Sequence, residues 1–117
     1  MIFIHYPPCS TCQKAKKWLD EQGLTYTARH IRDEAPSLAE LTEWLARSGL
    51  PLKRFFNTSG KLYAELALKD KLPTMTEAEQ LALLASDGML VKRPILVADE
   101  TVLVGFREKE WEKLLQK

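Results

Sequence analysis

The chain has 117 residues, of which 45% are hydrophobic and 28% are charged, a size and composition typical of one globular domain over residues 1–117. Its formal net charge of +1 argues against a dedicated nucleic-acid binder, which usually carries a strongly basic face. The apolar N-terminus is too short for a signal peptide, and no stretch approaches the roughly 18 apolar residues of a membrane span. We therefore expect a cytoplasmic protein without a membrane partner.

The first predicted elements are a strand, a helix and a second strand. Residues 2–4 are apolar β-formers followed by two prolines, which predicts a short buried strand. A helix capped by Ser10 or Thr11 is expected to end at Gly23. Residues 24–31 predict a second strand, and the two strands of such a β-α-β unit are parallel. The helix residues expected to face the core are Ala15, Trp18 and Leu19.

Two capping boxes predict the longer helices in the middle of the chain. Ser37 with Glu40 opens a helix that runs to Gly49, and Thr76 with Glu79 opens one that runs to Ser86. Between them we expect short helices around residues 55–56 and 63–66, with a turn at residues 59–60.

The C-terminal part predicts a hairpin and a final helix. The apolar residues 95–98 and 102–104 flank a polar turn and indicate two antiparallel strands. The element order is then β-α-β, a helical insertion over about residues 37–90, and β-β-α. This order predicts an α/β fold with a four-stranded mixed sheet covered by helices. The core residues expected on the last helix are Trp111, Leu114 and Leu115.

The two cysteines of the chain, Cys9 and Cys12, lie at the junction of the first strand and the first helix. The N–H groups and dipole of a helix N-terminus stabilise a thiolate, so Cys9 is the expected nucleophile. Cys12, one turn into the helix, is placed to resolve a mixed disulfide on Cys9. The alternatives are half a zinc site, two inert thiols or a structural disulfide. No second cysteine pair exists to complete a zinc site, and we expect no metal.

Two further residues are candidates for the same site. His5 lies four residues before Cys9, where a cationic imidazole would lower the pKa of the thiol; an ordinary solvent-facing histidine is the equal alternative. Arg93 could direct its guanidinium at an oxyanion beside Cys9, or be a surface arginine. Pro94 follows it at the start of a strand, which makes the Arg93–Pro94 bond a candidate cis peptide.

Four stretches of the chain resemble the arsenate reductase-like (ArsC/Spx/MgsR) family of bacterial proteins. They are HYPPCSTCQKA at residues 5–15, FNTSG at 56–60, KRPILV at 92–97 and VGFR at 104–107. The resemblance covers nearly the whole chain. It implies a thioredoxin-like fold with a helical insertion and a cis peptide before Pro94.

The resemblance also implies roles for individual residues. In the arsenate reductases of this family the first cysteine attacks arsenate, and glutathione with glutaredoxin completes the reduction. The nucleophile then falls on Cys9, its pKa-lowering histidine on His5, and two oxyanion-binding arginines on Arg93 and Arg107. Asn57 stands where a third arginine is expected, and Lys53 and Arg54 are the nearby cations that could compensate. The second cysteine looks more like the Spx/MgsR branch, whose members bind RNA polymerase and use the pair as a redox switch.

Three functions follow as hypotheses. The first is a thiol-dependent, arsenate reductase-like oxidoreductase that acts on a small oxyanion and has glutathione, glutaredoxin or thioredoxin as its electron donor. The second is a redox-switched transcriptional regulator of the Spx/MgsR type that binds the α subunit of RNA polymerase. The third is a glutaredoxin-like disulfide reductase. None of them requires a bound cofactor or direct contact with nucleic acid.

Overall fold

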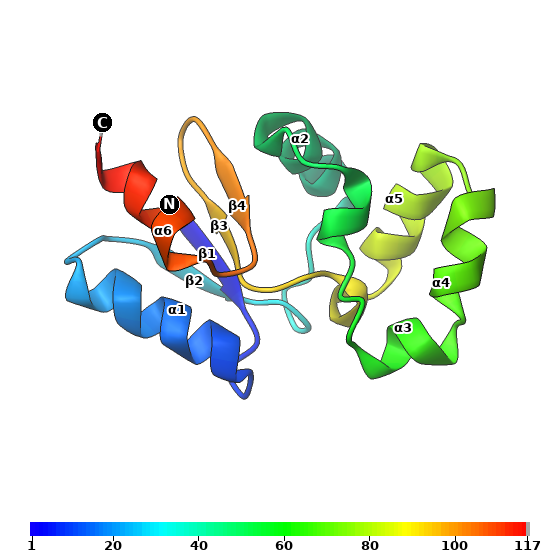
Figure 1. Cartoon of the computed structure of the whole chain (residues 1–117), viewed down its shortest axis with the longest axis horizontal. Coiled ribbons are helices and arrows are strands. Elements are labelled where there is room, and N and C mark those ends of the chain that lie inside the picture. The colour runs from blue at the N-terminus through cyan, green and yellow to red at the C-terminus, as the bar shows by residue number, and fades with distance from the viewer. Residues whose placement is uncertain (117) are drawn as a thin grey trace.

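The sheet of the molecule has four strands in the order β2-β1-β3-β4, with helices on both of its faces (Figure 1). The computed structural model describes residues 1–116, and side chains as far as residue 114. β2 runs parallel to β1, whereas β3 is antiparallel to both β1 and β4. The predicted four-stranded mixed sheet and thioredoxin-like α/β fold are therefore confirmed. The strands are β1 (Ile2–His5), β2 (Thr27–His30), β3 (Ile95–Val97) and β4 (Val102–Val104).

The helices divide between the two faces of the sheet (Figure 1). α1 and α6 lie together on one side, while α2 and the group α3, α4 and α5 lie on the other. The α-helices are α1 (Ser10–Glu21), α2 (Leu38–Ser48), α3 (Lys61–Glu65), α4 (Leu68–Lys71), α5 (Glu77–Ser86) and α6 (Glu108–Glu112). Short 3-10 helices cover Leu52–Phe55, Leu72–Thr74, Gly88–Leu90 and Lys113–Gln116.

Alternation along the central strands builds two separate cores. Phe3 and Leu96 face α1 and α6 and pack with Trp111, whereas Ile4 and Ile95 face the helices of the insertion, which include α2. Successive side chains of a strand point to opposite faces, so the short apolar strands β1 and β3 supply both cores at once. Burial of each such side chain contributes about 1.5–3 kcal/mol.

The predicted N-cap of α1 is wrong by one or two residues, and the difference matters for the site. The helix begins at Ser10, so its N-cap is Cys9 rather than Ser10 or Thr11. The predicted end is confirmed: Gly23 follows with a φ of +69°, a conformation that glycine adopts without strain. The helix buries Ala15, Trp18 and Leu19 as predicted, together with Cys12.

The other local predictions hold in part. The helix expected around residues 55–56 is a 3-10 helix over Leu52–Phe55, and Phe56 is extended, whereas the helix expected at 63–66 is present as α3. Both capping boxes are formed, at Ser37 and at Thr76, and the predicted hairpin is present as β3 and β4.

β2 covers only Thr27–His30, so residues 24–26 and 31 of the predicted strand lie outside it, and α4 was not predicted. Trp111 is buried at the start of the last turn as expected, while the side chain of Leu115 lies outside the described residues. No helix in the described part of the chain is long and apolar enough to cross a membrane.

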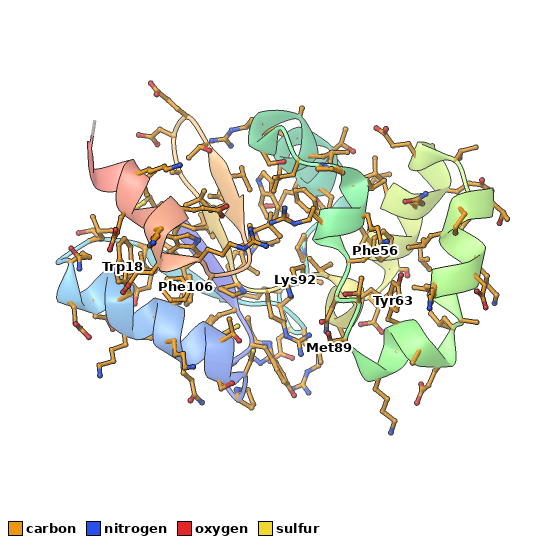
Figure 2. The ribbon with its side chains drawn as sticks, viewed as in Figure 1. Trp18, Phe56, Tyr63, Met89, Lys92 and Phe106 are labelled. Atoms are coloured by element: carbon orange, nitrogen blue, oxygen red, sulfur yellow. The ribbon has the colours of Figure 1, made fainter. Side chains whose placement is uncertain are left out.

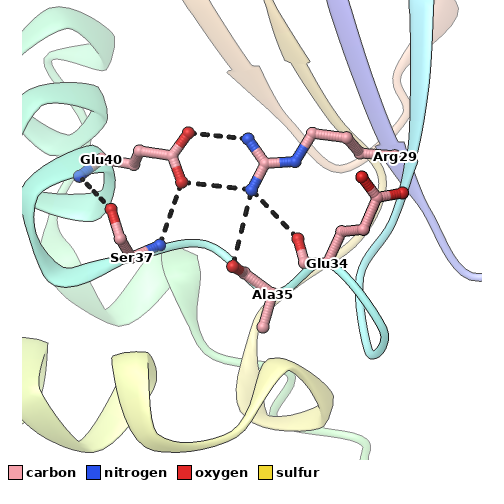
Figure 3. A network of polar contacts seen from close by, with 5 residues as sticks. All are labelled: Arg29, Glu34, Ala35, Ser37 and Glu40. Atoms are coloured by element: carbon pink, nitrogen blue, oxygen red, sulfur yellow. Dashed lines mark hydrogen bonds and ion pairs between the residues drawn. The ribbon is translucent and has the colours of Figure 1, made fainter.

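Arg29 ties the end of β2 to the start of α2 (Figure 3). Its guanidinium pairs with both oxygens of Glu40, at 2.6 and 3.1 Å, and donates to the Glu34 carbonyl at 3.0 Å. Glu40 also completes the capping box with Ser37. The Arg29 hydrogen bonds come first among the causes that lower the pKa of Glu40, ahead of burial, which raises it.

Replacing Arg29 with methionine is expected to lower the free energy of unfolding by about 1–3 kcal/mol at pH 7, because Glu40 loses its bidentate partner. A carboxylate whose folded pKa is lowered stabilises the fold above its unfolded pKa, and that stabilisation is lost as pH falls through the folded value. Urea unfolding should therefore show the difference between Arg29→Met and the wild type narrowing below about pH 4. The control is Arg32→Met, which replaces a side chain that is 57% exposed and should cost under about 0.5 kcal/mol. Equal losses for both variants would contradict this role of Arg29.

Candidate active site

Cys9 lies at the end of the loop between β1 and α1. Its N–H donates to the Tyr6 carbonyl at 2.9 Å, and its carbonyl accepts the N–H of Gln13 at 3.0 Å as the first bond of the helix. The Cys9 side chain forms no ordinary capping hydrogen bond, but the backbone N–H groups of Thr11 and Cys12 at the start of α1 still act on its sulfur, and a helix N-terminus favours negative charge. The expected nucleophile is thus half-buried at the positive end of a helix.

Opposing effects set the pKa of the Cys9 thiol. Burial is the largest single effect and raises the pKa, whereas the backbone and thiol of Cys12, the N–H of Thr11 and the side chain of Arg93 lower it. The lowering effects together outweigh burial, so the pKa of Cys9 lies below its ordinary value of 9.0. Because the thiolate is the reactive form of cysteine, this environment favours Cys9 as a nucleophile.

Cys12 lies beneath Cys9 in the opposite environment. It is completely buried, and its sulfur accepts the N–H of Tyr6 at 3.5 Å. Burial, helped by the negative charge of Cys9 and opposed by the Tyr6 N–H, raises the pKa of Cys12 to about 12. Cys12 is therefore protonated at neutral pH, and its thiol is in hydrogen-bond contact with that of Cys9. Such a thiol is suited to attack only after Cys9 has entered a mixed disulfide.

Arg93 reaches the cysteines from the segment before β3. Its guanidinium carbon lies 4.9 Å from the centre of the Tyr6 ring, in a cation–π contact. Its Nη1 atom is buried and has no hydrogen-bond partner among the described residues. A buried donor without a partner costs about 1–3 kcal/mol. An anionic atom bound beside Cys9 would remove this cost.

Tyr6 is the site residue that the sequence analysis missed. Its backbone contacts both cysteines, and its ring lies under Arg93 and against the edge of the His30 ring at 5.7 Å. The one local signal was an aromatic residue directly before the two prolines and Cys9. The cation over the ring, Arg93, lies far from Tyr6 in the sequence, and local patterns do not reveal such a contact.

The structure does not support the expectation of a cationic His5. His5 is the last residue of β1, and its ring lies 5.0 Å from that of Phe3. Burial first, then the charges of His30 and Lys16, lower the pKa of His5 below 6.5. The imidazole is therefore neutral at pH 7, and His5 is not among the groups that lower the pKa of Cys9. Arg93 and the N-terminus of α1 provide that effect instead.

The insertion returns to the sheet through a short antiparallel pairing that brings more cations to the site. Phe56 bridges to Val91, and the Lys92 N–H donates to the Phe55 carbonyl at 2.7 Å. Figure 2 shows Lys92 between Phe106, on the side of the sheet, and Phe56, on the side of the insertion. A cavity of about 430 Å³ opens there. Its polar lining consists of Thr11, Lys53, Arg54, Thr58, Lys92 and Arg107.

The remaining predicted residues differ in how they relate to this cavity. Arg107 lines it from the N-cap of α6, with a weak ion pair to Glu110 at 3.7 Å. Asn57 does not line it, although its neighbours do; the Asn57 amide lies over Gly60 instead. The Arg93–Pro94 bond is cis, as the resemblance implied. Pro94 is buried, and its carbonyl accepts the N–H of Gly105 at 2.8 Å.

No cluster of three or more metal-ligating side chains occurs among the described residues. Both cysteines are free thiols. The chemistry that the site offers comes from the thiol pair and the cations around it.

Comparison with known proteins identifies the family. The ArsC family model matches residues 4–114, and the chain belongs to this family. A crystal structure of a candidate ArsC family-related protein from Bacteroides fragilis is 61% identical, with a TM-score of 0.95, covering 97% of this chain and 95% of the other. A candidate arsenate reductase from Streptococcus mutans UA159 is 45% identical, with a TM-score of 0.86, covering 95% and 96%.

Two curated relatives come from Bacillus subtilis strain 168. The uncharacterized protein YusI is 54% identical over 113 residues, which are 97% of this chain and 96% of YusI. The regulatory protein MgsR is 31% identical over 117 residues, which are all of this chain and 91% of MgsR. The relatives thus confirm the family resemblance and include a regulator alongside the reductase-like structures.

The different environments of the two cysteines predict selective alkylation. Iodoacetamide at pH 7 should modify Cys9 rapidly and leave Cys12 unmodified, as located by peptide mass spectrometry. The rate should rise with pH to a plateau whose midpoint lies below 9.0, because only the thiolate reacts. Cys9→Ser should abolish the rapid phase. Faster labelling of Cys12, or a Cys9 midpoint at or above 9.0, would show that the environments are wrongly assigned.

Tyr6 is expected to position Arg93, and two variants isolate its ring. Tyr6→Leu removes the aromatic face beneath the guanidinium and should slow alkylation of Cys9 at pH 7 by about two- to fivefold, because the pKa of Cys9 moves upward. Tyr6→Phe keeps the face and should retain the wild-type rate. An equal effect of both substitutions would assign the loss to the hydroxyl or to packing, and not to the cation–π contact.

Proposed function

We propose that this protein is a thiol-dependent oxidoreductase in which Cys9 attacks the substrate and Cys12 resolves the resulting adduct. The observation that carries the proposal is the unequal thiol pair at the N-terminus of α1. Cys9 is half-buried with a lowered pKa, and Cys12 is fully buried with a pKa of about 12. A redox-active pair needs this division of roles, because one thiol must attack the substrate and the other must stay protonated until the adduct has formed.

The proposed reaction has two steps. The Cys9 thiolate forms a covalent bond to the substrate and displaces hydroxide from an oxyanion or a thiolate from a disulfide, and Arg93 offers its unpartnered Nη1 to the negative charge that develops there. Cys12 then loses its proton to solvent and attacks the Cys9 sulfur. The bond between Cys9 and the substrate breaks, its electron pair leaves with the reduced product, and a Cys9–Cys12 disulfide remains. An external thiol donor, namely glutathione with glutaredoxin, or thioredoxin, restores the pair.

The remaining assignments are part of the same proposal. Arg93 and Arg107 bind the anionic substrate, and Lys53 and Arg54 supply cations that Asn57 does not. Pro94 orients Arg93 at the start of β3, and His5 packs beside the loop as a neutral side chain. One domain spans the chain, with residues 37–90 inserted in it. A reducing cytoplasm suits a free thiol pair.

A redox-switched regulator is the second candidate, because MgsR aligns with the whole of this chain. In that case the Cys9–Cys12 disulfide would change the surface around the N-terminus of α1 rather than complete a catalytic cycle. The oxidised protein should then retain the α subunit of RNA polymerase in a pull-down, and the Cys9→Ser variant should not. Absence of retention in both redox states would exclude this function.

Turnover with a panel of thiol donors tests the enzymatic proposal. With arsenate or a disulfide as substrate, and thioredoxin or glutathione with glutaredoxin as donor, the wild type should turn over and Cys9→Ser should not. Cys12→Ala should stop after one turn and carry the adduct on Cys9, visible as added mass in the intact protein. No turnover with any pairing of substrate and donor would contradict the proposal.

A further inference from the structure

His30, the last residue of β2, lies next to the site, and the proposed reaction gives it no role. β2 pairs with β1 in parallel, and the register places His30 opposite His5, directly before Tyr6. The Ile31 N–H donates to the His5 carbonyl at 2.8 Å, which continues the pairing to the point where β1 ends. The end of β2 is thereby fixed beside the start of the loop that leads to Cys9.

Backbone contacts orient the His30 ring. Its Nδ1 atom accepts the N–H of Arg32 at 3.1 Å and the N–H of Asp33 at 3.3 Å. The His30 carbonyl accepts the N–H of Glu34 at 2.9 Å, which closes the turn after β2. A nitrogen that accepts two N–H groups carries no proton, so this hydrogen bonding assigns the N–H of the neutral ring to Nε2. The side chain is only 22% exposed, and the turn restricts it to this orientation.

The turn after β2 packs against the segment that carries Arg93. A Cβ on Gly88 would lie 1.9 Å from the carbonyl oxygen of Ile31, so glycine is what permits the two backbones to approach so closely. Gly88 opens the short 3-10 helix Gly88–Leu90, and Arg93 follows the end of that helix by three residues. His30 and Arg93 therefore reach the site from two segments whose relative position is fixed.

The Tyr6 ring contacts both of these segments. Its ring and that of His30 are 5.7 Å apart between centroids at an interplanar angle of 89°, an edge-to-face arrangement that aromatic pairs prefer. The Arg93 guanidinium carbon lies 4.9 Å from the centre of the Tyr6 ring. Because Nη1 of Arg93 has no hydrogen-bond partner among the described residues, the Tyr6 ring is a principal contact that orients the guanidinium. Arg93 in turn lowers the pKa of the Cys9 thiol.

We propose that His30 is a positioning residue of the site: its ring, oriented by the turn after β2, holds the Tyr6 ring in place beneath the Arg93 guanidinium. His30 acts on Cys9 only through these two residues and does not touch the substrate. This inference rests on the proposed role of Cys9 as the nucleophile. It extends the site to β2, which supplies none of the residues assigned to the reaction.

Two substitutions separate the ring of His30 from its hydrogen-bonding nitrogen. His30→Phe keeps an aromatic edge for Tyr6 and loses the acceptor of the turn. His30→Asn loses the ring and keeps an acceptor, because an asparagine oxygen can accept the N–H two residues further on. The readout is the pH profile of Cys9 alkylation by iodoacetamide, whose midpoint reports the Cys9 pKa and does not move with a change in overall stability alone.

His30→Asn should slow alkylation at pH 7 by about two- to fivefold and move the midpoint upward, because Arg93 loses its fixed platform. His30→Phe should retain the wild-type rate and midpoint. Where circular dichroism shows that His30→Asn does not fold, His30→Gln, which also lacks the ring, carries the same expectation. Wild-type behaviour of the ring-less variant would overturn the inference. A loss in His30→Phe as large as that in His30→Asn would do the same, since it would assign the effect to the turn.

The double variant Tyr6→Leu/His30→Asn shows whether His30 acts through Tyr6. Its alkylation rate should equal that of Tyr6→Leu, because the ring that His30 supports is already absent. A second loss that multiplies the first would mean that the two residues act independently, contrary to the inference.

Asp33→Asn is the matched control. It keeps the backbone N–H that His30 accepts and removes only a carboxylate that is 62% exposed and lies 3.9 Å from Nδ1. This variant should match the wild type, and a loss as large as that in His30→Asn would assign the effect to charge and overturn the role of the ring. A wild-type midpoint at or above 9.0 would instead overturn the proposed function, whatever the His30 variants show.

Discussion

The interaction on which the site depends is the one between the Cys9 sulfur and the N-terminus of α1. The sulfur is partly withdrawn from water, which on its own would keep the thiol protonated. Helix N–H groups, the neighbouring thiol and Arg93 more than compensate. The N–H groups belong to α1 itself. The rest of the fold provides the loop that makes Cys9 the N-cap and the segment before β3 that carries Arg93.

The same few atoms give the two cysteines opposite properties. Tyr6 illustrates this, because its carbonyl holds the backbone of Cys9, its N–H contacts the buried sulfur of Cys12, and its ring supports Arg93. The three contacts fix the relative positions of both thiols and the cation. A neutral His5 beside this loop adds packing and no charge.

Features determined by local chemistry could be predicted from the sequence, and those determined by distant contacts could not. Both capping boxes and the position of the thiol pair follow from short patterns, and they are found where the patterns indicate. α4 escaped prediction because it follows Ala67, a non-glycine residue at a φ of +53° without a capping side chain. The sequence left the charge state of His5 open, because burial and His30, on the adjacent strand, are tertiary effects. The local sequence made the bond before Pro94 a candidate cis peptide, and the family resemblance implied it.

The insertion supplies Lys53, Arg54 and Phe56 to a cavity that Thr11, at the start of α1, also lines. The central claim is that Arg93 and the N-terminus of α1 together lower the pKa of the Cys9 thiol. The most direct measurement is an NMR titration of the Cys9 ¹³Cβ shift in the reduced wild type and in Arg93→Gln. The account predicts a wild-type pKa below 9.0 and a higher value in the variant, because a cation has been removed. Identical titration curves for the two proteins, or a wild-type pKa at or above 9.0, would contradict it.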